Sequence, residues 1–367
     1  MKKVAIVTIS WGKNYGNKLQ NYATQEVYKK MGYKVETIKF KPTIKRKNNS
    51  KISKLRGISL NKAISKLKRL ICRKRLNSIE DNRSMCFEKF NNKIIFTKEY
   101  TEENYMSIPT NYDFYSVGSD QVWNAYFPDY SDYYLLNFLK TKNKITYSPS
   151  IGTNSIPEEK INDFKEALSK FKFLSCREEE GATLLKNILN KDVEVLIDPT
   201  LLLTSDEWSK VISKPKCHNN KKYILCYFLG MKDRKNFKII KKYAKDHNLE
   251  IINLLDPMSK YYGTGPSEFL FLEKNAEIIF TDSFHSSVFA LIFNRPFVIF
   301  KRNDEYKNMD SRLDTLISKF KLVNRRFDGQ QITKENENND YTLAYDILKK
   351  EREKSIQFIK KSLGIKK

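Results

Sequence analysis

Short apolar runs recur along this chain in two series, and stretches with helix-like spacing separate most of them. The first series is VAIVTI, KVETIKF, YDFYSVG, KITYSPS, FKFLSCR and VEVLID, and the second is KYILCYFL, LEIINLL, AEIIFTD and PFVIFK. Alternation of strands and helices predicts parallel sheets that are covered by helices. We therefore expect an α/β protein with two Rossmann-like, doubly wound domains that face one cleft.

A polar segment containing proline, SKPKCHNNKK at 213–222, separates the two series and suits a linker. The chain has 367 residues, of which 40% are hydrophobic, enough for two ordinary cores. The sequence thus predicts an N-terminal domain over 1–212 and a C-terminal domain over 213–340. The helix-like tail, 341–367, is expected to pack back across both.

The net charge of +25 is concentrated in a basic arm at 41–77, which holds fourteen Lys or Arg and no Asp or Glu. Within it, apolar residues follow helical spacing at Leu60, Ala63, Ile64, Leu67, Leu70 and Ile71. Such a helix could lie on an anionic membrane surface, or it could pack on its own domain with its lysines in solvent. No aromatic residue interleaves the basic run, so nucleic acid is not an expected partner.

The five cysteines form neither a CxxC pair nor a Cys/His metal pattern. We expect reduced thiols and no bound metal. No signal peptide precedes the first apolar run, and no run approaches the length of a membrane span. The predicted location is cytoplasmic, with the basic arm as the one candidate for peripheral contact with the inner face of the membrane.

Polar side chains follow the predicted strands at the points where a parallel sheet binds its ligands. They are Asn17, Gln20, Asp120, Gln121, Trp123, Arg177, Ser283, His285, Ser286, Lys301 and Arg302. Each also has a structural interpretation: Asp120 could cap a helix, Trp123 could pack in the core, and Arg177 could pair with the glutamates that follow it. Their recurrence at strand ends of both domains favours a shared site.

Seven segments, in chain order, resemble the polysaccharide pyruvyl transferase family, in its bacterial branch with the GSDQVWN signature. They are NYGNKLQNYA, VGSDQVWN, SPSIG, CREEEGATLL, IDPTLLL, GPSEFLFL and TDSFHSSVFALIFNRPF. The resemblance implies a glycosyltransferase-B-like arrangement of the two domains. It also implies an enzyme that transfers pyruvate from phosphoenolpyruvate to a sugar of a bacterial surface polysaccharide, or of its lipid-linked precursor, as a ketal.

The resemblance also implies roles for the strand-end residues. His285 is the expected general acid, since histidine is the side chain that most often donates a proton in catalysis, and Asp120 could take the proton of the sugar hydroxyl. The donor side would include Arg177, Ser283, Ser286, Lys301 and Arg302, since phosphoenolpyruvate calls for cations and helix N-termini. The acceptor side would include Asn17, Gln20, Gln121 and Trp123. Phosphoenolpyruvate is the co-substrate, and no cofactor is expected.

One departure from the family pattern concerns the donor. Many members carry Arg-Leu-His where this chain has Ser283-Phe284-His285. Either Lys301, Arg302 or Arg312 supplies the lost charge, or the donor differs. Two other functions stay open: a glycosyltransferase of the same architecture that uses a nucleotide sugar, and a non-enzymatic scaffold that binds through the basic arm.

Overall fold

The computed structural model describes residues 1–43, 61–230, 233–302 and 311–365, with the backbone alone for 61–75. Its strands form two main parallel sheets. The first has the order β3-β2-β1-β4-β5 and the second the order β11-β10-β8-β9, while β6 pairs with β7 apart from both. The strands are β1 (Lys3–Val7), β2 (Lys34–Lys41), β3 (Phe96–Thr101), β4 (Phe114–Val117), β5 (Lys144–Thr146), β6 (Ser175–Cys176), β7 (Glu194–Val195), β8 (Tyr223–Tyr227), β9 (Glu250–Asn253), β10 (Ile278–Thr281) and β11 (Phe297–Ile299).

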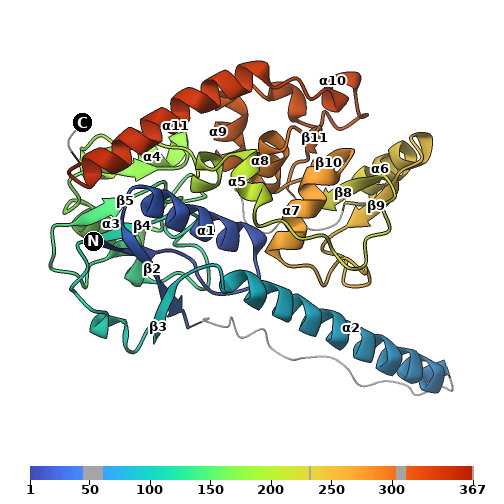
Figure 1. Ribbon diagram of the computed structural model, residues 1–367, viewed down its shortest axis with the longest axis horizontal. Helices are drawn as coiled ribbons and strands as arrows, with labels where there is room; N and C mark the ends of the chain where they lie inside the picture. Colours follow the sequence, from blue (N-terminus) through green and yellow to red (C-terminus); the bar gives the residue numbers. More distant parts are fainter. Residues whose placement is uncertain (44–60, 231–232, 303–310, 366–367) are drawn as a thin grey trace.

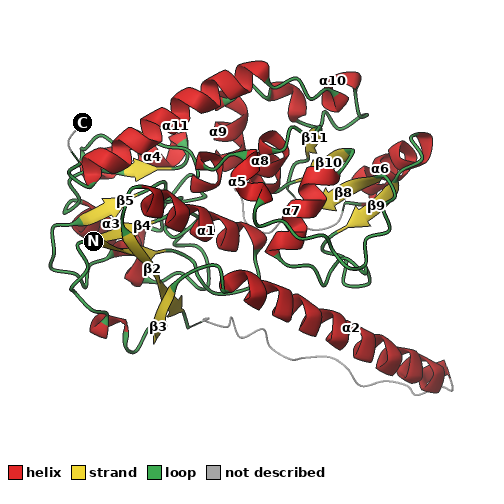
Figure 2. Cartoon of the chain, in the orientation of Figure 1, coloured by secondary structure: helices red, strands yellow, loops and turns green. Residues whose placement is uncertain are grey.

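Helices accompany both groups of strands, as Figure 2 shows. The α-helices are α1 (Tyr15–Lys30), α2 (Asn61–Asn91), α3 (Glu158–Leu168), α4 (Glu179–Leu189), α5 (Ser205–Ser209), α6 (Arg234–Asp246), α7 (Pro266–Asn275), α8 (Phe284–Ile292), α9 (Ser311–Lys319), α10 (Lys334–Glu337) and α11 (Thr342–Ser362). Four short 3-10 helices are η1 (Tyr105–Ser107), η2 (Asp132–Leu135), η3 (Pro199–Leu202) and η4 (Val323–Arg325). The α/β class with parallel sheets, predicted from the alternation of the chain, is confirmed.

The central strands explain why the apolar runs show so little alternation. β8 is buried at every position, and β1 at every position after Lys3. A parallel strand with helices on both faces has no solvent side, so its sequence is apolar throughout. The parallel pairing also brings the carboxyl ends of neighbouring strands to one edge of each sheet.

The two halves of the chain are packed against each other through aromatic side chains. Tyr15 of α1 stacks on Phe269 of α7 with ring centroids 4.7 Å apart, and Trp208 meets Phe289 edge-on at 5.1 Å. These residues belong to one hydrophobic cluster that contains side chains of both sheets. The core is therefore continuous between the halves.

The last helix, α11, contacts both halves (Figure 1). Its Arg352 donates to the carbonyl oxygens of Leu201 and Leu203, at 2.6 and 3.0 Å. Near its start, the hydroxyl of Tyr345 donates to the carbonyl of Leu291 in α8 at 2.9 Å. The helix thus joins η3, in the first half of the chain, to α8 in the second.

The long helix α2 extends well beyond the rest of the molecule in Figure 1. Its C-terminal turns pack on the body, where Asn82 donates to the carbonyl of Gly263 at 2.9 Å. Residues 44–60 of the predicted basic arm lie outside the described residues, and 61–77 form the first part of this helix. Within the described part of the chain, no helix is both long and apolar enough to cross a membrane.

Candidate functional site

A cavity of about 460 Å³ opens where the carboxyl ends of strands from both sheets meet. The first half contributes loops that follow β1 and β4, including Asn17, Asp120 and Gln121. The second half contributes residues that follow β10 and β11, including Ser283, His285 and Arg302. Six of the residues predicted from strand ends therefore line one cavity.

His285 lies in the first turn of α8, directly after the strand β10 and its exit residue Asp282. The side chain is only 7% exposed. Its ring lies against Gly16 in the first turn of α1, so closely that a Cβ atom on Gly16 would be 2.1 Å from Nδ1. Because real atoms cannot approach to that distance, this position of the imidazole requires a glycine at 16.

The local sequence at the start of α1 determines where Gly16 lies. Asn14 caps α1, since its side chain accepts a hydrogen bond from the backbone N–H of Asn17 at 3.2 Å. The cap starts the helix directly after the loop from β1, which puts Gly16 and Asn17 in the turn that faces α8. The beginnings of two helices, one from each half, thus meet at the cavity.

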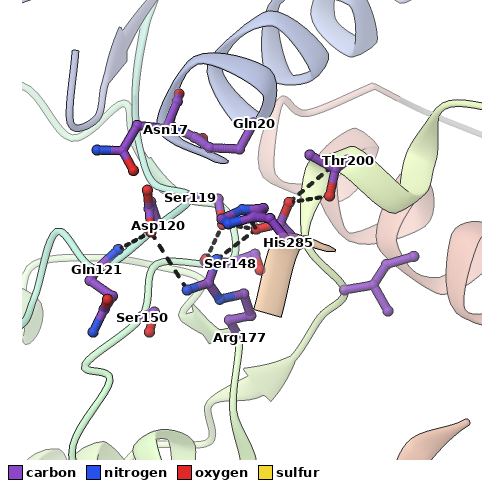
Figure 3. A network of polar contacts seen from close by, with 12 residues as sticks. Asn17, Gln20, Ser119, Asp120, Gln121, Ser148, Ser150, Arg177, Thr200 and His285 are labelled. Carbon is purple, nitrogen blue, oxygen red and sulfur yellow. Dashed lines mark hydrogen bonds and ion pairs between the residues drawn. The ribbon is translucent and has the colours of Figure 1, made fainter. Parts of the chain in front are cut away.

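A buried carboxylate, that of Asp198, joins polar groups of the site that Figure 3 labels, among them Ser119, Arg177 and Thr200. Its Oδ2 atom accepts hydrogen bonds from Arg177 Nη1 at 2.7 Å and from Ser119 Oγ at 2.9 Å, and lies 3.7 Å from His285 Nε2. Its Oδ1 atom accepts from the backbone N–H and the hydroxyl of Thr200. The carboxylate comes from the first half of the chain and the imidazole from the second.

The surroundings of Asp198 keep it ionised. Burial alone would raise the pKa of this carboxyl, but His285, Arg177 and Thr200 together lower it well below its usual range. A permanent negative charge 3.7 Å from Nε2 attracts an imidazolium, although no hydrogen bond joins the two groups within the described chain. The arrangement is suited to holding a proton on His285 at the wall of the cavity.

Arg177 is a supporting residue, which holds other side chains of the site in place. Its guanidinium donates to Asp198, lies 3.7 Å from Asp120 Oδ1 and covers the ring of Phe284 at 4.5 Å. Burial would lower its pKa, but the carboxylates nearby raise it. The side chain is 2% exposed and does not line the 460 Å³ cavity. This geometry therefore offers no direct, bidentate contact between Arg177 and a donor.

The interpretation that Arg177 pairs with the glutamates beside it is also wrong. Glu178 is turned toward a different loop, where its Oε1 atom accepts from Ser150 Oγ and from the backbone N–H groups of Ile151 and Gly152. The carboxylate nearest to Arg177 is that of Asp198, 21 residues further along the chain. Glu178 shapes the loop that packs behind Gln121.

Asp120 has the geometry of a group that can act on a ligand. The preceding Gly118 has φ of 109°, and a Cβ there would be 2.3 Å from the carbonyl oxygen of Tyr147, so the loop after β4 requires glycine. This turn directs Asp120 into the cavity. Its Oδ1 atom accepts from the N–H of Gln121 at 2.9 Å, and its Oδ2 atom has no hydrogen-bond partner within the described chain.

Comparison with known proteins shows which family this chain belongs to. The sequence model of the polysaccharide pyruvyl transferase family matches residues 14–304. The chain belongs to the polysaccharide pyruvyl transferase family. It is therefore an enzyme, and the resemblance found from its strand-end segments is confirmed. A comparison with curated protein sequences gives no significant match.

Solved structures similar to this pyruvyl transferase share its fold. The S. aureus MnaA–UDP co-structure aligns with a TM-score of 0.50 and 11% identity, over 100% of this chain and 98% of that one. The UDP-GlcNAc 2-epimerase from Neisseria meningitidis bound to UDP-GlcNAc gives a TM-score of 0.47 and 10% identity, over 99% of both chains. At 11% identity the likeness to MnaA concerns the fold alone, and together with the two parallel sheets it confirms the expected glycosyltransferase-B-like fold.

Two acceptor residues predicted for this pyruvyl transferase do not reach the cavity. Trp123 is fully buried, with its indole N–H directed to the carbonyl of Tyr134 and its ring against Phe164. The prediction that a sugar stacks on Trp123 is wrong, because the residue packs in the core. Gln20 is also fully buried and donates to Thr8 Oγ1 at 2.8 Å, so it braces the end of β1.

Two donor residues are placed differently from the prediction as well. Ser286 lies on the inner side of α8 and donates to the buried carboxyl of Glu273 at 2.6 Å. Lys301 lines a neighbouring pocket of about 270 Å³, whose walls include Phe228, Phe237 and Phe300. Neither contacts the cavity of His285, whereas Ser283 and Arg302 do.

Several residues of the site had no functional assignment from the sequence. Asp198 lies three residues after β7, near a strand exit, and this position was the signal that could have identified it. Arg83 of α2 lines the cavity and donates to Tyr15 Oη and to the carbonyl of Tyr262, both at 2.7 Å. It lies within a charged helix, where no local pattern distinguishes it. Among the described residues, no group of His, Cys, Asp and Glu is arranged to hold a metal ion.

Proposed function

We propose that this enzyme transfers pyruvate from phosphoenolpyruvate to two hydroxyl groups of a sugar in a bacterial surface polysaccharide or its lipid-linked precursor. The observation that carries the proposal is the His285–Asp198 pair at the wall of a cavity formed by both halves. Ketal formation needs a proton on the methylene carbon of the enol, and a buried imidazole beside a permanent carboxylate can deliver it.

The proposed reaction runs in four steps. His285 gives its proton to C3 of phosphoenolpyruvate, which makes C2 electrophilic. One sugar hydroxyl adds to C2 and loses its proton to Asp120, which lines the cavity and whose Oδ2 atom has no hydrogen-bond partner in the described chain. The C2–O bond to the phosphate then breaks, and inorganic phosphate leaves with the proton that Asp120 held. The second hydroxyl adds to C2, gives its proton to His285, which the first step left neutral, and closes the ketal.

The remaining cavity residues divide between the substrates. Ser283 and Arg302, at the strand ends of the second half, are proposed to contact the anionic donor. Asn17 and Gln121, from the first half, present amide groups of the kind that bind sugar hydroxyls. Arg177 is proposed to act through Asp198 and Asp120, which it holds in place.

A donor assay tests this function. The enzyme is incubated with a panel of sugar acceptors and either phosphoenolpyruvate or nucleotide sugars. We expect inorganic phosphate to be released from phosphoenolpyruvate only when an acceptor is present. Release of a nucleoside diphosphate from a nucleotide sugar, with phosphoenolpyruvate left intact, would instead establish the glycosyltransferase alternative.

We also propose that α2 holds the enzyme near an anionic membrane, where lipid-linked sugars are assembled. The helix extends away from the body in Figure 1, and its first part belongs to the basic arm. Each Lys or Arg close to an anionic leaflet contributes about 1 kcal/mol of binding free energy. The predicted location is thus cytoplasmic and peripheral.

Vesicle sedimentation measures this association. The enzyme should sediment with vesicles that contain anionic lipid, less so at high salt. Replacing Lys66, Lys68, Arg69, Arg73 and Lys74 by glutamine should abolish sedimentation and leave activity on a soluble acceptor unchanged. The matched control replaces Arg234, Lys235, Lys238, Lys241 and Lys242 on the exposed face of α6. Equal binding by both variants, or binding to neutral vesicles, would contradict the proposal.

A further inference from the structure

The cavity wall contains an arginine, Arg312, for which the described part of the chain offers no ion-pair partner. Arg312, at the start of α9, lines the 460 Å³ cavity and is only 8% exposed. Its Nε atom has no hydrogen-bond partner, and no carboxylate forms an ion pair with it within the described chain. A buried arginine normally has both, because an unpaired charge is costly to remove from water.

The neighbours of Arg312 increase this cost. Arg312 and Arg177 line the same narrow gap beside Phe284, so two guanidinium groups lie near each other. Burial and the charge of Arg177 lower the pKa of Arg312 to about 10, although the more distant Asp120 and Glu178 oppose this. Asp120 Oδ1 lies 3.7 Å from Arg177 and Glu178 Oε1 accepts from the 150–152 loop, and neither carboxylate forms an ion pair with Arg312 within the described chain.

Other groups on the same wall favour an anion. Arg302 adds a second cation from the end of β11, and Ser283 adds a hydroxyl directly before α8. The first turn of α8 also directs backbone N–H groups and the positive end of the helix dipole toward this wall. On the first half, Lys13 pairs with Glu80, and Arg83 donates to oxygen atoms of Tyr15, Tyr262 and Lys13, whereas neither kind of partner is found for Arg312 within the described chain.

We propose that Arg312 binds a phosphate group of the ligand and is the residue that selects an anionic substrate at this site. Arg312 places the positive charge on α9. The residue directly before α8 is Ser283, which is a neutral hydrogen-bond donor beside it. The inference rests on the proposed function only for the identity of the ligand. The same chemistry would suit the phosphate of phosphoenolpyruvate or that of a nucleoside diphosphate.

Thermal-shift and calorimetric titrations of the full-length enzyme test the assignment, with inorganic phosphate, phosphoenolpyruvate and UDP as probes. Arg312→Gln should weaken phosphate binding by about 10- to 100-fold, the worth of one or two charge-assisted hydrogen bonds. Without ligand, this variant should melt at or above the temperature of the wild type, because it lacks a buried unpaired charge. A purely structural arginine would give the opposite shift.

The matched control is Arg326→Gln. Arg326 does not line the cavity, and it pairs with Asp314, which lies on the same helix as Arg312. It should bind phosphate as the wild type does. Arg312→Met, which keeps the apolar stem, carries the test if the glutamine variant does not fold. Unchanged phosphate affinity in the Arg312 variants, or no binding of any probe by the wild type, overturns the inference. Arg312-dependent binding of phosphate and UDP without phosphoenolpyruvate would uphold it and refute the proposed donor.

Discussion

Replacing His285 by glutamine is expected to lower turnover by about 100-fold or more, which is the usual worth of general acid catalysis. The amide cannot protonate the enol carbon, whereas the cations that would hold the donor stay in place. Donor affinity should therefore change little. Initial rates of phosphate release, together with titration of phosphoenolpyruvate, separate the two effects.

The matched control for this variant is His247→Gln. His247 lies at the end of α6, where its exposed ring stacks on Tyr243, and its loss should leave turnover unchanged. A second variant, Gly16→Ala, displaces the imidazole without removing it, since the new Cβ would clash with Nδ1. Both Gly16→Ala and His285→Gln should lose turnover. A folded His285→Gln enzyme with normal rates would show that the imidazole serves packing alone.

Replacing Asp198 by asparagine is expected to reduce both stability and turnover. Among the described residues, the variant leaves the buried Arg177 with Asp120, at 3.7 Å, as its one remaining ion-pair partner. Breaking a buried ion pair from one side costs about 3 to 5 kcal/mol. His285 also loses the charge that favours its protonated form. Urea unfolding measures the first effect, and the rate of phosphate release measures the second.

A double variant, Asp198→Asn with Arg177→Gln, distinguishes the two roles of the carboxylate. It removes the unpaired cation, so part of the lost stability should return while turnover stays low. Wild-type stability in Asp198→Asn alone would contradict the ion-pair account. Recovery of turnover in the double variant would show that Asp198 does not act on His285.

The same carboxylate gives a pH dependence of definite sign. The pKa of Asp198 is lower in the folded protein than in the unfolded chain, so its contribution to stability is complete above the unfolded value of about 3.9. It is lost progressively as the pH falls below that value. Stability of the wild type should therefore decline below about pH 4, and Asp198→Asn should lack this part of the decline.

The sequence predicted the fold class and the edge of the sheets where the site lies, because apolar runs and strand exits are local patterns. It could not predict which strand-exit residues face the cavity. Trp123 and Gln20 lie only three residues beyond Asp120 and Asn17, respectively, yet they turn into the core. Side-chain direction in these loops depends on packing across the sheet, which leaves no periodic signal in one sequence.

The pairing inside the site was even less accessible to sequence reasoning. Asp198 has the local appearance of a turn residue, and its role depends on Arg177 and on His285 from the other half of the chain. The need for glycine at position 16 likewise becomes visible only in the structure, where the ring of His285 packs on it. Such contacts result from the docking of the two halves, and single positions do not reveal them.

Because His285 and Asp198 come from different halves of the chain, the distance between them depends on how the two halves are packed. Asp198 precedes η3, which α11 fastens to α8 through Arg352 and Tyr345, while His285 lies on α8 itself. Because α11 ties η3 to α8, a movement of the halves could lengthen the 3.7 Å separation and withdraw the charge from the imidazole only after these hydrogen bonds break. Proton delivery would then cease whenever bulk water gains entry, so that a bound enol could be protonated only in the closed enzyme.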